Sequence, residues 1–142
     1  MLYVEPLGGL CNRMRTIASF YTVARASGRD LAVVWLRDAG MNCPAARLFK
    51  LPEHVKLIDR PYVSKPHMRL RSLGRILTHR AEGRRFDRTV ENWQAKAALT
   101  PETVRALKDK SLYASSCYSL ESDYEKYDYS IFQPAPDIQA LA

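Results

Sequence analysis

The sequence predicts an α/β domain of the Rossmann-like kind, in which a mainly parallel sheet is the middle of three layers. Three observations predict this class. An apolar strand enters a pair of glycines at Gly8-Gly9, a stretch with helical spacing runs from Asn12 to Ser27, and a continuously apolar run occupies Leu31 to Leu36. Strand, glycine turn, helix and strand in this order form a βαβ unit, which binds ligands at the carboxyl end of its first strand.

The first predicted strand is Leu2-Tyr3-Val4, which Glu5 and Pro6 close. In the helix that follows, apolar side chains recur at helical spacing while arginines lie elsewhere around it; the apolar positions are Met14, Ile17, Tyr21 and Ala24. Gly28 supplies the helix stop. The run from Leu31 to Leu36 does not alternate between apolar and polar residues, as expected of a parallel strand buried on both faces.

Farther along the chain, the pattern predicts shorter elements. Helical stretches are expected at 44–51, at 101–108 after a Thr100 cap, and from Pro136, and strands at 55–58 and 112–120. Residues 60–92 are interpreted as a basic loop or insertion, with a broken helix around 68–81.

The length of 142 residues fits one domain, so residues 1–142 are interpreted as a single Rossmann-like unit. A formal net charge of +7 favours anionic partners such as a nucleotide diphosphate or a nucleic acid. The stretch from Met1 to Leu10 has the pattern of neither a signal peptide nor a membrane span, which predicts a cytoplasmic protein. The three cysteines have no ligand spacing, so we expect reduced thiols and no metal.

The turn that joins the first strand to the helix is the best-placed candidate site. Its residues are Gly8, Gly9, Leu10, Cys11, Asn12 and Arg13. Such a turn presents backbone N–H groups and a helix N-terminus at the mouth of a parallel sheet, which suits a phosphate. The residues alone leave open a plainer interpretation, in which the glycines only form the turn and the arginines only solvate the helix. The spacing is that of neither a dinucleotide fingerprint nor a P-loop.

A wider pattern around this turn resembles the amino-terminal motif of fucosyltransferase-like glycosyltransferases. That motif reads Gly-Gly-Leu-Gly-Asn-Arg or Gln, then a helix, then Gly-Arg and a strand ending in Trp. The matching residues are Gly8-Gly9-Leu10-Cys11-Asn12-Arg13-Met14-Arg15, Ala18, Ala24, Gly28-Arg29 and Leu31-Ala32-Val33-Val34-Trp35, followed by Cys43 and Leu48-Phe49. The group includes the protein O-fucosyltransferases and the bacterial nodulation α-1,6-fucosyltransferases, whose two facing Rossmann-like domains make up the fold called GT-B.

The resemblance implies transfer of a sugar from a nucleotide-sugar donor, GDP-linked and for example GDP-fucose, to a glycan or other acceptor, with no metal. It places Asn12 near the reacting centre as the catalytic candidate. It assigns Gly8, Gly9 and Asn12, and more weakly Arg13, to the donor pyrophosphate and the acceptor. Cys11 is a departure, because the family usually has glycine there.

The family's second half carries a His-x-Arg-x-x-Asp motif whose arginine clamps the leaving diphosphate. That triplet does not occur in this sequence. In the family it tends to follow a segment like Ser130-Ile131-Phe132-Gln133-Pro134. We therefore expect the chain to be an amino-terminal half without its donor-binding domain, and not to be active alone.

Two other classes of function remain open. The first is a non-catalytic basic domain that binds nucleic acid or another polyanion through the arginine-rich segment from Arg69 to Arg88. Against it, aromatic side chains for stacking on bases are sparse in that segment. The second is a degenerate half-domain that pairs with a partner chain, for which exposed apolar surface would be expected.

Overall fold

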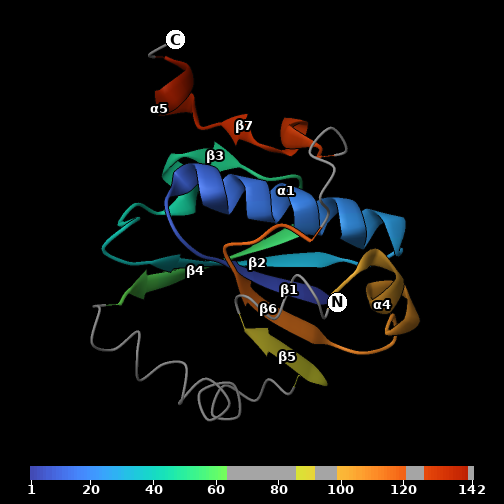
Figure 1. Ribbon diagram of the computed structural model, residues 1–142. Helices are drawn as coiled ribbons and strands as arrows, with labels where there is room; N and C mark the ends of the chain where they lie inside the picture. The colour runs from blue at the N-terminus through green and yellow to red at the C-terminus, as the bar shows by residue number, and fades with distance from the viewer. Residues whose placement is uncertain (64–85, 92–98, 121–126, 141–142) are drawn as a thin grey trace.

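Five parallel strands form the sheet at the centre of the protein, in the order β4-β2-β1-β6-β5 (Figure 1). The computed structural model describes residues 1–63, 86–91, 99–120 and 127–140. The strands are β1 (Leu2–Pro6), β2 (Leu31–Arg37), β4 (Val55–Tyr62), β5 (Arg88–Glu91) and β6 (Leu112–Ser116). Every neighbouring pair is parallel. The predicted Rossmann-like α/β class with a mainly parallel sheet is therefore confirmed.

The helix α1 (Leu10–Ala26) connects β1 to β2 and completes the predicted βαβ unit. It begins two residues earlier than the apolar spacing predicts, because Gly9 is its N-cap and the Arg13 amide donates to the Gly9 carbonyl at 3.0 Å. The predicted stop is confirmed. The chain turns at Gly28 with a φ of 63°, where glycine carries no steric penalty.

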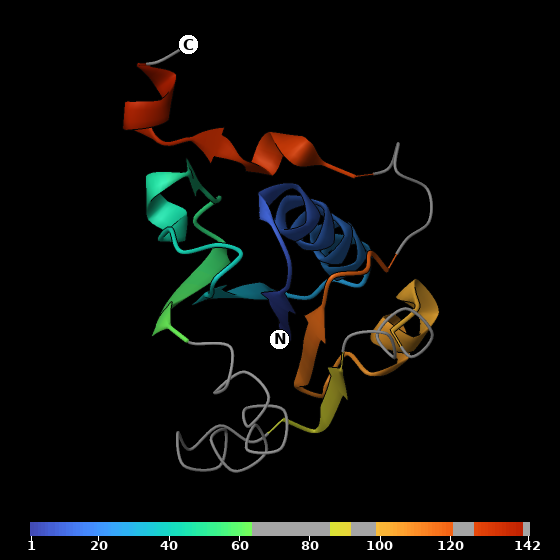
Figure 2. The same cartoon turned by 60° about the vertical axis from the view of Figure 1, so that its left-hand side comes forward.

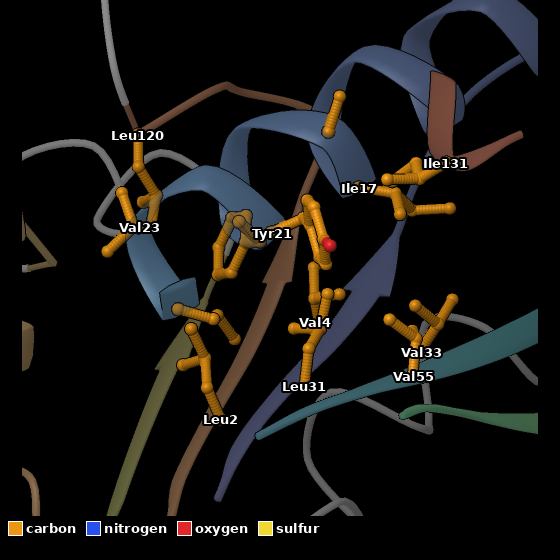
Figure 3. Close-up of a cluster of buried hydrophobic side chains, with 14 of the residues drawn as sticks. Leu2, Val4, Ile17, Tyr21, Val23, Leu31, Val33, Val55, Leu120 and Ile131 are labelled. Atoms are coloured by element: carbon orange, nitrogen blue, oxygen red, sulfur yellow. The ribbon is translucent and has the colours of Figure 1, made fainter. Parts of the chain in front are cut away.

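The main core lies between α1 and one face of the sheet (Figure 3). Alternate residues of the strands point to this face, as the period of two requires; they include Leu2, Val4, Leu31, Val33 and Val55. They meet Ile17, Tyr21 and Val23 of α1. Burial of apolar area at about 25 cal/mol per Å² makes this layer the main source of stability.

The other face of the sheet is buried as well. Tyr3 and Glu5 of β1 alternate with the core residues, and so do Tyr113 and Ser115 of β6. The Phe86 ring packs between them, 4.8 Å from the Tyr3 ring and 5.0 Å from that of Tyr113. Since both faces are covered, the sheet is the middle layer of the fold.

A short helix, α4 (Pro101–Ala106), precedes β6 and shares the core with α1. Its predicted cap is confirmed, since the Thr103 amide donates to the Thr100 hydroxyl at 3.2 Å. The helix ends at Ala106, two residues before its predicted end. Arg29, which precedes β2, donates to the carbonyl of Val104 in the last turn of α4 and to that of Leu107, the C-cap.

The last part of the described chain lies across α1, on the side away from the sheet (Figures 1 and 2). It consists of η3 (Tyr129–Ile131), β7 (Gln133–Pro134) and α5 (Pro136–Gln139), the last of which confirms the helical turn predicted from Pro136. β7 pairs antiparallel with β3 (Phe49–Lys50) in a separate two-stranded sheet. The Phe132 and Phe49 rings pack at 4.9 Å and join the two segments.

Two predicted elements differ in type or length because tertiary contacts decide them. The helix predicted at 44–51 is only a 3-10 turn, η1 (Ala45–Arg47), since Phe49 and Lys50 bond to β7 instead of continuing a helix. The strand predicted at 112–120 ends at Ser116, because the Ser116 hydroxyl accepts from the Tyr118 amide at 2.9 Å and turns the chain.

The basic loop predicted at 60–92 is wrong at both ends. β4 continues to Tyr62, past the predicted stop at Pro61, because β4 is an edge strand and the register with β2 shifts there so that no ladder donor is needed from proline. Residues 88–91 form β5 rather than loop. The broken helix predicted around 68–81 lies outside the described residues.

Candidate functional site

The turn between β1 and α1 is held at both sides by backbone hydrogen bonds. The Leu7 amide donates to the Ser116 carbonyl of β6 at 2.9 Å. Gly8 has a φ of 87°, and a Cβ placed there would lie 3.2 Å from the Asn12 side-chain nitrogen. Gly9 is extended, and a Cβ placed on it would meet open space. Only the first of the two glycines is therefore required by conformation and by close approach.

The first turn of α1 leaves backbone donors directed at the mouth of this turn. The amides of Leu10, Cys11 and Asn12 precede the first helical hydrogen bond and have no partner within the helix. No acidic residue lies in this first turn. The N-terminus of a helix of this length has a positive end that binds anions. The amides that the sequence analysis assigns to a phosphate therefore lie at the N-terminus of α1, and phosphate binding there stays a prediction.

The predicted site residues divide into two groups. Gly8, Gly9, Cys11 and Asn12 are exposed at the mouth of the turn. Leu10 is half-buried with its side chain on the core, and Arg13 is fully buried. Arg13 therefore has no exposed surface with which to meet a ligand directly.

The exposed Asn12 lies over the turn. Its Oδ1 accepts a hydrogen bond from the Arg15 guanidinium at 2.9 Å, and its amide nitrogen lies beside Gly8. The amide is thus oriented by a neighbouring cation, with its nitrogen next to the glycine turn. Cys11 lies inside α1, where φ is negative, so its backbone does not need the glycine found in the family motif. The three cysteines form no disulfide within the described residues.

Arg13 connects the glycine turn to the end of β2. Its Nε donates to the Gly8 carbonyl at 2.6 Å, and its Nη1 to the Leu36 carbonyl at 2.5 Å. Its Nη2 pairs with the Asp38 carboxylate at 2.8 Å. The guanidinium also lies 4.8 Å from the centre of the Trp35 ring. Burial lowers the pKa of Arg13, while Asp38 and Glu5 oppose that shift. The guanidinium stays charged at neutral pH, because arginine side chains in proteins are effectively always protonated.

Asp38 is the acidic residue that follows β2. Its Oδ2 bonds to Arg13, and its Oδ1 accepts from the amides of Gly40 and Met41 at 2.8 and 2.9 Å. In dinucleotide-binding folds, an acid after the second strand binds the ribose. Here the carboxylate already bonds to groups of the protein, which argues against dinucleotide recognition.

Sequence reasoning missed Trp35 and Asp38 as parts of the site. The available indication was the acid itself, which directly follows a strand that is buried from Leu31 to Leu36 and ends at Arg37. The position of Arg13 in the first turn of α1 gives no indication of its burial, because arginines at such positions are usually solvated.

The candidate site lies where the order of the strands in the sheet reverses. β1 has β2 on one side and β6 on the other, and the chain visits β2 and β4 before it returns to β5 and β6. The crevice beyond the carboxyl ends of the strands at such a switch point is the usual binding place of open α/β sheets. Ser116 and the exposed Tyr118 lie at the end of β6. They are next to the glycine turn, because the Leu7 amide before that turn donates to the Ser116 carbonyl.

A buried carboxylate lies below the turn, on the second face of the sheet. Glu5 accepts from the Tyr113 hydroxyl at 2.5 Å and from the Ser115 hydroxyl at 3.4 Å. Its side chain has no exposed surface. Glu5 therefore supports the strands under the site and has no direct access to a ligand in this arrangement.

Within the described ranges, no group of three or more His, Cys, Asp or Glu residues is arranged to hold a metal ion. A metal-free reaction stays a prediction. In the same part of the chain, every helix is too short or too polar to cross a membrane.

Comparison of the chain with protein-family models, with curated proteins and with solved structures finds no match.

Proposed function

We propose that this chain is the acceptor-side, Rossmann-like half of a glycosyltransferase that uses a nucleotide-sugar donor, GDP-linked. The observation that carries the proposal is the placement of the Gly8–Asn12 turn, with its unpaired helix amides, at the carboxyl ends of β1 and β6, where the strand order reverses. The resemblance of the same residues to the fucosyltransferase-like motif supports the sugar-transfer chemistry and one half of a GT-B fold.

The chemistry follows from where charge develops. As the glycosyl C–O bond breaks, negative charge accumulates on the leaving diphosphate, and oriented N–H donors stabilise that charge. The amides at the start of α1 suit this role, and Asn12 is the proposed catalytic residue beside them. In this mechanism, the arginine of the His-x-Arg-x-x-Asp motif is supplied by a domain or chain other than these residues.

A titration of the isotope-labelled chain with GDP tests the ligand. We expect the amide resonances of Gly8 to Asn12 to shift, with affinity near the millimolar range for one half of a site, about −4 kcal/mol. Absence of shifts, or shifts confined to other parts of the chain, would contradict the proposal. A random oligonucleotide titrated at two salt concentrations covers the polyanion-binding alternative, for which binding should weaken steeply with salt.

Asn12→Ala tests the catalytic assignment in the protein purified from its native cells. We expect turnover with GDP-fucose to fall by about 10²-fold, as for loss of one stabilising donor, with an unchanged melting temperature. Asn42→Ala is the matched control, because Asn42 is also an exposed asparagine but lies after β2. Equal turnover in the two variants would remove Asn12 from the reaction.

A further inference from the structure

We infer that Asp38 is a positioning residue for the glycine turn and acts on it through Arg13. The proposed function supplies the class of ligand, but the coupling of the two loops rests on the geometry alone. Asp38 has the contacts that this role requires. Its Oδ1 accepts from two amides of the turn after β2, and its Oδ2 accepts from Arg13. The loop after β2 and the loop after β1 are thereby joined by one cation.

The peptide group between Gly8 and Gly9 explains what this joining does. Its carbonyl oxygen accepts from the buried Nε of Arg13 at 2.6 Å. Because a trans peptide is planar, the N–H of Gly9 points opposite to that carbonyl, away from the buried guanidinium. Arg13 therefore fixes the direction of the Gly9 N–H, a donor that neither α1 nor the sheet uses.

Asp38 in turn fixes Arg13. The guanidinium has no exposed surface, and the Asp38 carboxylate is the partner with which it forms an ion pair in the described structure. A buried cation without its counter-charge is strongly disfavoured and moves toward water. Such a movement would release the Gly8 carbonyl and the Leu36 carbonyl together. Lysine cannot replace the planar fork that reaches three acceptors.

Asp38→Asn tests the inference with little change of shape. Asparagine keeps an oxygen for the Gly40 and Met41 amides but puts an NH₂ group against Arg13. Asp59→Asn is the matched control, because Asp59 pairs with Arg37 at 3.8 Å and its side chain is 34% exposed, against 17% for Asp38. Both variants remove one carboxylate near the same end of the sheet.

The first readout is amide hydrogen exchange, which needs no ligand. The amides of Leu7 and Arg13 bond to Ser116 and Gly9 at either side of the turn, and that of Val104 bonds in α4. In Asp38→Asn we expect exchange at Leu7 and Arg13 to be at least tenfold faster, with Val104 within twofold. Unchanged exchange at Leu7 and Arg13, or an equal rise at Val104, overturns the inference.

The second readout is the affinity for inorganic pyrophosphate. Removing a carboxylate should by charge alone strengthen anion binding in both variants. We expect at least a fivefold loss in Asp38→Asn and no loss in Asp59→Asn, which only a change of loop geometry explains. A gain in both variants overturns the inference.

Two further outcomes are separable. If the wild-type chain binds no pyrophosphate while the loop amides respond as expected, the proposed ligand is wrong and the positioning of the loop by Asp38 stands. If Asp38→Asn does not fold, Arg13→Lys takes its place in both measurements. It keeps the charge but loses the fork, and the same results are expected and the same ones overturn the inference.

Discussion

The two ends of the parallel sheet each bury an arginine, and the two arginines have different partners. At the carboxyl end, Arg13 bonds to two carbonyls and the Asp38 carboxylate and lies over the Trp35 ring. At the amino end, the partners to which Arg29 donates within the described residues are all carbonyls, those of Met1, Val104, Leu107 and Lys110. Burial lowers the pKa of both side chains.

The difference in partners separates two tasks. The carbonyls that Arg29 binds include those at the end of α4, where the negative end of a helix favours a cation, so Arg29 fastens α4 and the chain start to the sheet. Arg13 instead holds the glycine turn at Gly8, and several of the residues that follow Gly8 are exposed. Both arginines belong to the pattern that resembles the fucosyltransferase-like motif. Part of such a pattern thus describes how a βαβ unit is held together, and only part describes a site.

Arg29→Met should cause the largest loss of stability among these variants. A small loss would contradict the structural role that the comparison gives to Arg29. Methionine keeps the length of the side chain but leaves the buried carbonyls without a donor, so we expect a loss of about 3 kcal/mol in the free energy of unfolding. Urea unfolding measures it. Arg105→Met is the control, because Arg105 is exposed and makes one long bond of 3.3 Å to Ala26; a loss below about 0.5 kcal/mol is expected.

Gly8→Ala against Gly9→Ala sharpens the description of the carboxyl end. Alanine at position 8 is strained at a φ of 87° and lies close to Asn12, so we expect about 1–2 kcal/mol of destabilisation. Alanine at position 9 meets open space and an extended backbone, and a change within about 0.5 kcal/mol is expected. Thermal unfolding of the two variants measures both changes in stability. Equal losses of stability would mean that Gly8 is not held in this conformation.

The smallest effect is expected at the amino end, from Asp87. The Ser111 amide and hydroxyl donate to its carboxylate at 2.6 and 3.0 Å and lower its pKa. A depressed pKa means that the carboxylate adds stability fully above its unfolded value of about 3.9 and loses it as pH falls through the folded value.

Urea midpoints of the wild type and Asp87→Asn should therefore differ slightly at pH 6, and the difference should shrink progressively as pH falls below about 4. Asp137→Asn, at an exposed position in α5, is the control and should follow the wild type across the same range. A difference between wild type and Asp87→Asn that stays constant with pH would show that the charge of Asp87 is not what Ser111 recognises.

Local patterns predict the first βαβ unit well, because its apolar runs and its glycines determine both the elements and their order. β5 could not be predicted in the same way. Of its four residues only Val90 is buried, and pairing with β6 rather than apolar content makes Arg88–Glu91 a strand. β3 and β7 depend entirely on each other, although distant in the sequence.

The position of the candidate site in the fold could be predicted from the sequence, but its side-chain contacts could not. The glycine pair and the following helix indicate the exposed amides correctly. The burial of Arg13 depends on Trp35 and Asp38, which only the parallel pairing of β1 with β2 brings near it. No spacing rule within one helix contains that information.

The position of β6 beside β1 has a consequence for synthesis of the chain. Leu2 is aligned with Leu112, so one side of β1 has no partner until β6 has left the ribosome. At about 5–20 residues per second, β1 waits roughly 5–20 s for β6. An unpaired strand edge can pair with another nascent chain. The strand order that places β1 in the middle of the sheet thus leaves the nascent chain with an open sheet edge until β6 has been made.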